Sequence, residues 1–241
     1  MNMESTYPTH ICWALVLAAI LNLDRLALGQ NAFWRPLVAG LIIGLLVGQV
    51  RLGLTLGLWV EVLWLGRPPL GGAIIPNGAL ALSAALVGLA GSLSFLNLPP
   101  DPQKPLAPLA LGLIIPLAHY MTSIEPMTRR WGEFSHNALA KALENDLAPQ
   151  IWKANLVGIG LTFSLALAFS LFGALVMALI SVIALSAFPQ WFWQTLVKLQ
   201  FLIPILCFVY MGLYFNRSKL NRYALTTVIT LILLSILSVA L

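Results

Sequence analysis

Long apolar runs separated by short polar segments dominate the chain. A membrane-spanning helix needs about 20 consecutive apolar residues, and three runs clearly reach that length, at residues 78–98, 105–123 and 223–241. A fourth run, at residues 189–215, is similar although it contains one lysine and one proline. The pattern therefore predicts an all-α, polytopic membrane protein.

The run at residues 154–188 is longer than one membrane crossing requires. It carries no charged residue, and at about 1.5 Å per residue it exceeds the ~30 Å apolar core of a bilayer. It forms either one long tilted helix or two short arms that bend near Gly173. We favour one helix, because the basic segments at residues 129–153 and 217–222 then lie on the same side of the membrane, as short Lys- and Arg-rich loops usually do.

The first third of the chain is divided into shorter apolar pieces. Residues 11–23 are too few for an ordinary span before Asp24, and a Gly- and Pro-rich run at residues 66–72 interrupts the next apolar stretch. Irregular backbone at membrane depth is tolerated only where protein or a wet cavity covers it. We therefore predict re-entrant or broken helices over residues 10–77, of the kind that form substrate sites in transporters.

One amphipathic segment interrupts the apolar pattern, between residues 125 and 153. Apolar side chains follow one helical face, and charged or polar side chains follow the other. We expect this helix to lie at the cytoplasmic membrane interface. The chain is then a single membrane domain, residues 1–241, with broken helices over 10–77, two spans over 78–124, the amphipathic helix over 125–153 and about three spans over 154–241.

Composition supports a membrane location. Of the 241 residues, 60% are hydrophobic and 9% are charged, and the mean hydropathy is +0.91, whereas a soluble domain carries about 25% charged residues. The net charge is +5, but no basic patch lies outside the polar loops, so we do not expect nucleic-acid binding. The common phosphate-loop, metalloprotease and serine-hydrolase motifs are absent. We therefore expect no cofactor, no metal and no catalysis by this chain alone.

Glycines recur every four residues in the first third of the chain. Gly40, Gly44 and Gly48 form one set, and Gly53 and Gly57 repeat the spacing. On a helix this spacing makes a flat stripe where another helix approaches closely. The stripe indicates either ordinary helix packing or tight packing that supports a substrate site.

Glu61 is the residue whose position most needs a physical explanation. It lies between Trp59 and Trp64 in an apolar segment, where a charge at mid-membrane costs about 2.5–3.5 kcal/mol on insertion scales. A carboxylate persists there mainly where it is paired, faces water or binds a ligand. Glu61 either accepts hydrogen bonds from sugar hydroxyls or forms an ion pair with a nearby arginine. The candidate arginines are Arg35, Arg51 and Arg67.

Three further polar residues of the same region are candidates for a binding site. Neutral polyols are bound by several convergent donors and acceptors, and Asp, Asn and Gln side chains suit that role. We therefore predict a substrate site formed by Glu61, Asn77, Asp24 and Gln30. Each of the last three is equally compatible with a role as a helix cap or loop residue.

Spaced motifs occur in one order along the chain and resemble those of a known family. They read WRPLVAG at residues 34–40, GLLVG at 44–48, GLWVEVLWLG at 57–66, GGAIIPN at 71–77 and FSH at 134–136. This series resembles the IIC subunits of the mannose/fructose/sorbose family of bacterial phosphotransferase systems. The match is good over residues 20–95, partial over residues 125–155 and weak beyond.

The resemblance implies a function. Such IIC subunits pair with a IID membrane subunit, form higher oligomers in the bacterial cytoplasmic (inner) membrane and move a hexose inward. A soluble IIB protein then phosphorylates the sugar with phosphate relayed from phosphoenolpyruvate through IIA. The resemblance also implies that Glu61 and Asn77 are similar to polar positions along the family's sugar path, with Asp24 and Gln30 as companions.

Departures from the family pattern leave an alternative open. Ile75 replaces the first proline of a Pro-Pro pair, Asn77 is followed by glycine, and residues 196–200 occupy the region of a late glycine-rich stretch. A non-transporting IIC-like scaffold or regulatory membrane subunit is the alternative to a permease. A third class, an intramembrane enzyme or another type of transporter, has no visible catalytic pair to support it.

Overall fold

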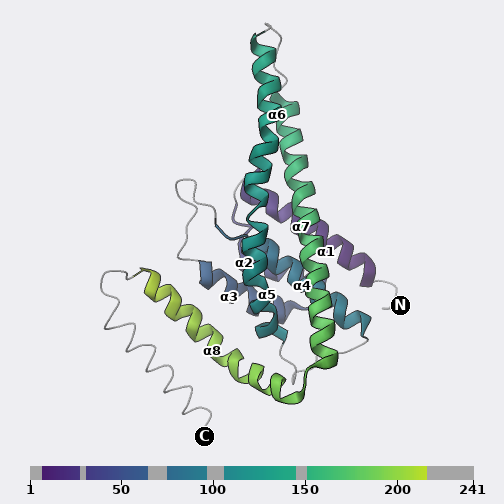
Figure 1. The fold of residues 1–241 in the computed structure, drawn as a ribbon, viewed down its shortest axis with the longest axis vertical. Coiled ribbons are helices and arrows are strands. Elements are labelled where there is room, and N and C mark those ends of the chain that lie inside the picture. The colour runs from purple at the N-terminus through teal and green to yellow at the C-terminus, as the bar shows by residue number, and fades with distance from the viewer. Residues whose placement is uncertain (1–6, 28–30, 65–74, 97–105, 145–150, 216–241) are drawn as a thin grey trace.

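The computed structural model describes residues 7–27, 31–64, 75–96, 106–144 and 151–215, which form helices joined by turns with no strand among them (Figure 1). The predicted all-α class is therefore confirmed. The helices are α1 (Tyr7–Leu26), α2 (Pro36–Leu46), α3 (Val50–Trp64), α4 (Gly78–Phe95), α5 (Leu106–Met121), α6 (Ile124–Glu144), α7 (Ile151–Ala187) and α8 (Gln190–Phe215).

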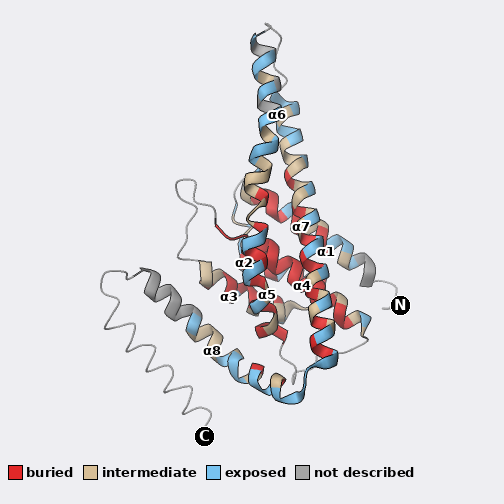
Figure 2. Ribbon diagram, viewed as in Figure 1, coloured by how far each residue is buried: buried red, intermediate tan, exposed pale blue. Residues whose placement is uncertain are grey.

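Helix α4 is the centre of the fold. Nearly all of its residues are buried, and it packs against α1, α2, α3, α5 and α7 (Figure 2). At the crossing with α7, a Cβ on Gly88 would collide with the backbone carbonyl of Ala174. A helix that is apolar on every side is expected where other helices surround it completely, as they do here.

Helices α2 and α3 form a short hairpin whose faces meet at glycines. A Cβ on Gly40 would collide with the carbonyl of Gly53, and a Cβ on Gly53 would collide with the carbonyl of Gly40. Gly48 lies in the turn between the helices with φ of +70°, a conformation that glycine adopts without strain. The glycine spacing therefore makes the close helix contact that the sequence predicts.

The lengths of these helices agree in part with the expected broken region. Helix α2 has 11 residues and covers roughly 16 Å, about half of the ~30 Å bilayer core. Helix α1 differs from the expectation, because it continues for 20 residues and includes Asp24 and Arg25 in its last turn. The first break in the helical pattern therefore comes after Leu26, at the end of α1, and not before Asp24. The Gly- and Pro-rich run at residues 66–72 lies outside the described residues.

Helix α7 is one continuous helix of 37 residues, as favoured from the sequence. At about 1.5 Å per residue it is roughly 55 Å long and must extend beyond the ~30 Å apolar core. Its N-terminal part pairs with α6 in a projection that we call the stalk, residues 124–144 and 151–162 (Figure 1). Most of the stalk is exposed (Figure 2).

Helix α6 has the expected amphipathic sequence, but its position differs from the expected flat helix. It follows α5 after a short turn at residues 122–123 and continues outward beside α7 (Figure 1). The pairing with α7 covers only part of its apolar face, because Trp131 and Phe134 remain 57% and 76% exposed.

Several helices are long and apolar enough to cross a membrane. Within the described part of the chain, this holds for Gly78–Phe95, for Leu106–Lys141 and for Ile151–Ala187. The first and third match the predicted runs at 78–98 and 154–188, and the fourth predicted run is helical as α8. The run at residues 223–241 lies outside the described residues.

The glycine contact between α2 and α3 leads to a first prediction. Gly53→Ala should lower the melting temperature of the purified protein, because the added Cβ must push the two backbones apart at a cost of about 1–3 kcal/mol. The control is Gly112→Ala in α5, where a Cβ meets nothing within 4 Å. Equal melting temperatures for the two variants would contradict the close approach.

Candidate functional site

Two asparagines meet in the buried interior where α1 passes the start of α4. Asn77 is 4% exposed, and its Nδ2 donates to Oδ1 of Asn22 at 2.7 Å. The other end of the Asn77 amide caps α4, because its Oδ1 accepts from the backbone N–H of Leu80 at 3.3 Å. The backbone N–H of Asn77 donates to the carbonyl of Ala118 in α5 at 3.0 Å. Asn77 therefore ties α1, α4 and α5 together.

The Asn22 amide still has hydrogen-bonding capacity. Asn22 is 4% exposed, and its Nδ2 is buried without a hydrogen-bond partner among the described residues. Leaving a buried amide donor unpaired costs about 1–3 kcal/mol, so native proteins rarely keep such a group without a reason. The unpaired Nδ2 is a donor that a polar ligand or a water molecule would satisfy.

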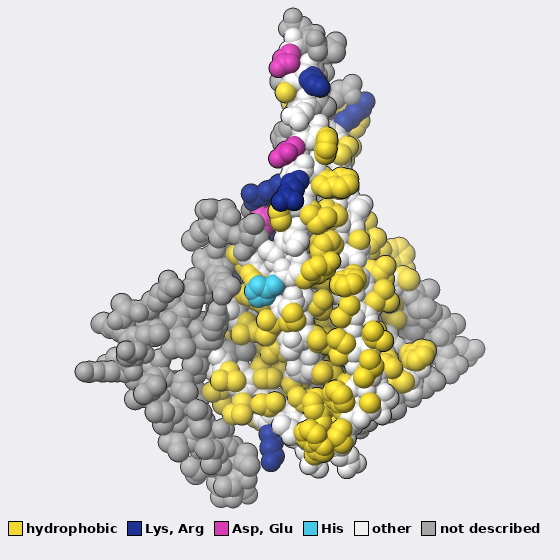
Figure 3. Space-filling model, in the orientation of Figure 1, with side chains coloured by type: hydrophobic (Ala, Val, Ile, Leu, Met, Phe, Trp, Pro, Cys, Tyr) yellow, Lys and Arg dark blue, Asp and Glu magenta, His cyan; other side chains and the backbone are white. Residues whose placement is uncertain are grey.

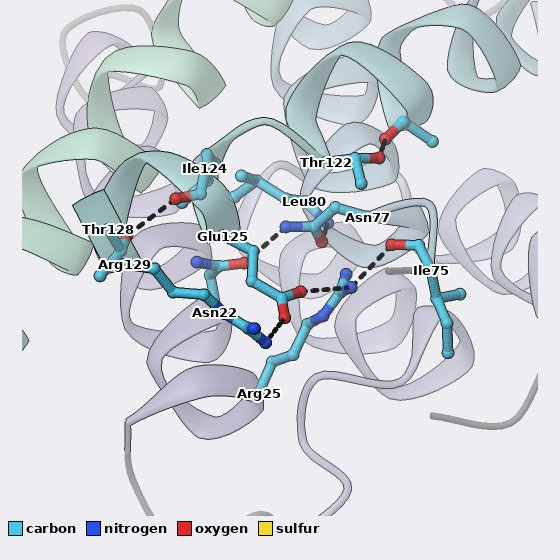
Figure 4. A network of polar contacts seen from close by, with 11 residues as sticks. Asn22, Arg25, Ile75, Asn77, Leu80, Thr122, Ile124, Glu125, Thr128 and Arg129 are labelled. Carbon is cyan, nitrogen blue, oxygen red and sulfur yellow. Dashed lines mark hydrogen bonds and ion pairs between the residues drawn. The ribbon is translucent and has the colours of Figure 1, made fainter. Parts of the chain in front are cut away.

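Three charged residues lie beside the asparagines. Arg25 donates to the carbonyl of Ile75 at 2.7 Å and lies 3.8 Å from a carboxylate oxygen of Glu125. The other Glu125 oxygen accepts from Arg129 at 2.6 Å. We call Asn22, Arg25, Asn77, Glu125 and Arg129 the polar junction (Figure 4). It connects the end of α1, the segment before α4 and the start of α6.

The charges of the junction differ in burial. The side chains of Arg25 and Glu125 are 11% and 16% exposed, whereas that of Arg129 is 65% exposed. Glu125 thus neutralises a largely buried guanidinium on one side and reaches a solvent-facing one on the other. This arrangement keeps a buried cation paired, as a low-dielectric interior requires.

Asp24 has a structural role in the loop after α1. Its carboxylate accepts from the backbone N–H groups of Asn31 and Phe33, both at 2.8 Å, and of Trp34 at 3.3 Å. The Arg25 guanidinium in turn lies over the Trp34 ring, with its Cζ atom 5.7 Å from the centroid of the ring. Asp24 therefore holds the loop that leads into α2 against the polar junction.

Glu61 is paired, as one of the two sequence interpretations allowed. Its Oε1 accepts from Arg35 at 3.1 Å, and its Oε2 accepts from the backbone N–H of Leu37 at 3.3 Å. Arg35 precedes α2, so the carboxylate lies at the positive end of that helix, where a negative charge is stabilising. Arg35 is thus the partner among the described candidates, Arg35 and Arg51, whereas Arg67 lies outside the described residues.

The predicted residues occupy one region but not one contact network. The α3 residues Val60 and Trp64 lie against Gly78, next to Asn77, so Glu61 and Asn77 belong to neighbouring elements. Gln30 lies outside the described residues. The sequence prediction missed Asn22, Glu125 and Arg129. Asn22 could have been recognised as a lone amide inside an apolar run, whereas nothing in the sequence indicates that residue 125 meets residue 25.

The buried ion pair provides a second prediction. Glu125→Gln should destabilise the protein by about 1–3 kcal/mol, because Arg25 then loses its counter-charge in a mostly buried position. The matched control is Glu133→Gln, an exposed position on the same helix. Thermal unfolding of both variants in one detergent measures the difference. A double variant, Arg25→Met with Glu125→Leu, should recover part of the loss, because it removes both charges together.

Comparisons with known proteins agree on one family. A family model described as "PTS system sorbose-specific iic component" matches residues 9–240. The chain is 31% identical over 103 residues to the protein named "Putative N-acetylgalactosamine permease IIC component 2" of Escherichia coli (strain K12), covering 43% of this chain and 68% of that relative.

A solved structure titled "Structure of membrane protein" has the same fold. It aligns with a TM-score of 0.63 at 18% identity and covers 100% of this chain and 97% of its own. The family match over nearly the whole chain agrees with the apolar helices and with the order of the sequence motifs. The protein belongs to the sorbose-specific IIC family of phosphotransferase-system components, membrane permease subunits that take part in transport and are not catalysts by themselves.

Proposed function

We propose that this protein is the sugar-translocating IIC subunit of a phosphoenolpyruvate-dependent phosphotransferase system. It works as a multi-pass protein of the bacterial cytoplasmic membrane, together with a IID subunit and the phosphocarriers IIB and IIA. Its substrate is a hexose of the mannose, fructose and sorbose class. The similarity to a permease component named for N-acetylgalactosamine adds amino sugars to the candidates.

The observation that carries this proposal is the buried amide pair of Asn22 and Asn77. The surrounding helices are apolar, and the Asn22 Nδ2 has no partner among the described residues. An amide offers both a donor and an acceptor, which is what a sugar hydroxyl requires. We place the sugar beside this pair, with Asn77, Glu61, Asp24 and Gln30 as the proposed site residues.

In the proposed site, the Glu61 carboxylate exchanges its ion-pair partner, Arg35, for a sugar hydroxyl. The Arg35 side chain is 52% exposed, whereas that of Glu61 is 16% exposed. An ion pair with one solvent-facing member contributes about 0–1 kcal/mol, so a sugar hydroxyl can displace Arg35 at small cost. The Glu61 carboxylate then accepts hydrogen bonds from the sugar in place of the guanidinium.

The apolar surface of α7 supports assembly with a membrane partner. Large apolar side chains along this helix are 47–63% exposed, at Leu171, Phe172, Leu175, Leu179 and Ile183. Figure 3 shows hydrophobic side chains covering the middle of this face. Such a surface needs lipid or other membrane helices around it, so it is compatible with a IID subunit and with a higher oligomer.

A non-transporting IIC-like scaffold is the alternative function. The observation that favours it is that both predicted carboxylates have structural partners. Asp24 accepts from three backbone N–H groups, and Glu61 binds Arg35 and the start of α2. A scaffold would assemble with its partners but would not take up sugar.

Uptake measurements test the proposal. The chain is reconstituted in vesicles with IID, and the phosphorylation of internalised hexose by IIB is followed. Asn22→Ala should raise the KM for sugar about tenfold, because a donor to the sugar is lost. Ser83→Ala is the matched control. This buried serine donates to the Ala79 carbonyl in its own helix, away from the junction, and its loss should leave KM unchanged.

Three outcomes decide between the candidates. A raised KM for Asn22→Ala with normal membrane assembly supports the proposed site. Equal KM values for Asn22→Ala, Glu61→Gln and the unchanged protein would remove the amide pair and Glu61 from the sugar site. Normal assembly without uptake by the unchanged protein, for every hexose tried, would favour the scaffold.

A further inference from the structure

A groove lies at the base of the stalk and shares Arg129 with the polar junction. Its volume is about 570 Å³, and it is lined by residues of α6 and α7 and by Ala27, which follows α1. Polar side chains in its wall are Thr128, Arg129, Asn155 and Thr162. Apolar and small residues, among them Leu139, Ile159 and Gly158, form the rest. The groove therefore combines a cationic end with an apolar wall.

Among the described residues, the wall of this groove contains one cation, Arg129, and no carboxylate. Arg129 lines it, and the side chain of Arg129 is 65% exposed despite its bond to Glu125. The guanidinium carries five N–H donors, so Arg129 can bind a second anion beside the Glu125 carboxylate.

The groove lies where the apolar helices give way to the polar stalk. In Figure 3, dark blue side chains gather just above the broad apolar surface, at the base of the projection. Aromatic side chains occur on the stalk, with Trp131 57%, Phe134 76% and Trp152 62% exposed. Exposed tryptophans together with Lys and Arg are typical of the membrane–water interface.

We propose that this groove binds one anionic phospholipid. The phosphate group contacts the Arg129 guanidinium, and the side-chain amide of Asn155 serves as an additional donor. An acyl chain lies along Gly158 and Ile159 on the apolar side. Basic pockets between membrane helices take anionic headgroups in this way. The proposal requires only that the protein lies in a membrane, so it does not depend on the sugar site.

Two glycines of α7 provide a matched steric test. A Cβ on Gly158 or on Gly160 meets nothing within 4 Å, so both positions tolerate a side chain. Gly158 lines the groove, whereas Gly160 does not. Gly158→Leu should therefore fill the groove and reduce phosphatidylglycerol binding at least fivefold, while Gly160→Leu should bind it like the unchanged protein.

The measurement is native mass spectrometry of the purified full-length protein with phosphatidylglycerol, and with phosphatidylcholine of the same acyl chains as the neutral reference. Arg129→Gln should lower phosphatidylglycerol affinity about fivefold, as expected for one basic residue at a membrane surface. Glutamine can still donate to Glu125. Arg51→Gln, an exposed arginine on α3, is the control and should have no effect.

Several results would overturn the proposal. Equal retention of the two lipids by the unchanged protein would show that the groove does not select an anionic headgroup. Equal losses in the Gly158 and Gly160 variants would show that the lipid binds elsewhere. Displacement by glycerol 3-phosphate at the concentration of the lipid would indicate a site for a soluble phosphate. Loss of assembly with the membrane partner in Gly158→Leu, with lipid binding unchanged, would identify the groove as a protein interface.

Discussion

A charge inside an apolar helical protein must be paired, and this constraint determines where α1, α4 and α6 meet. Arg25 is 11% exposed, and an unpaired guanidinium in that position would be strongly destabilising. The Glu125 carboxylate and the Ile75 carbonyl supply its partners. Glu125 lies in the first turn of α6, and Ile75 precedes α4. The position of the stalk relative to the helical core therefore depends on the pairing of Arg25.

The same constraint explains the two carboxylates in the first third. Asp24 is 8% exposed and is satisfied by backbone N–H groups of the loop that follows it. Glu61 is satisfied by Arg35 and by the N-terminus of α2. Both groups therefore fix where the short hairpin of α2 and α3 begins, and the hairpin is held next to the polar junction as a result.

The sequence predicts the local features of this fold well, because they depend on neighbouring residues. Apolar runs predict α4, α5 and α7, and the spacing of Gly40, Gly44 and Gly53 predicts a close helix contact. The charge-placement argument favours one continuous α7, which the structure confirms. These inferences need only helical periodicity, chain length and the bilayer thickness.

The pairing of distant polar groups could not be predicted in the same way. Asn77 binds Asn22 across 55 positions of the chain, and this partner is fixed by how α1 crosses α4. The sequence offers several arginines for Glu61, and the packing of α2 on α3 brings Arg35 to it. The amphipathic pattern of α6 likewise identifies an apolar face without showing whether a membrane or another helix covers it.

The bonds of the two carboxylates suggest which one a sugar can use. Freeing Asp24 would break three hydrogen bonds to backbone N–H groups and release the loop before α2. Each hydrogen bond to a charged group contributes about 1.5–3 kcal/mol. The free energy lost by breaking three of them therefore exceeds the stabilisation that one or two sugar hydroxyls would supply. Freeing Glu61 from Arg35 breaks one bond to a half-exposed guanidinium, which remains solvated. Within the proposed site, Glu61 is therefore the carboxylate that can accept from a sugar, and Asp24 acts by keeping the loop beside it in place.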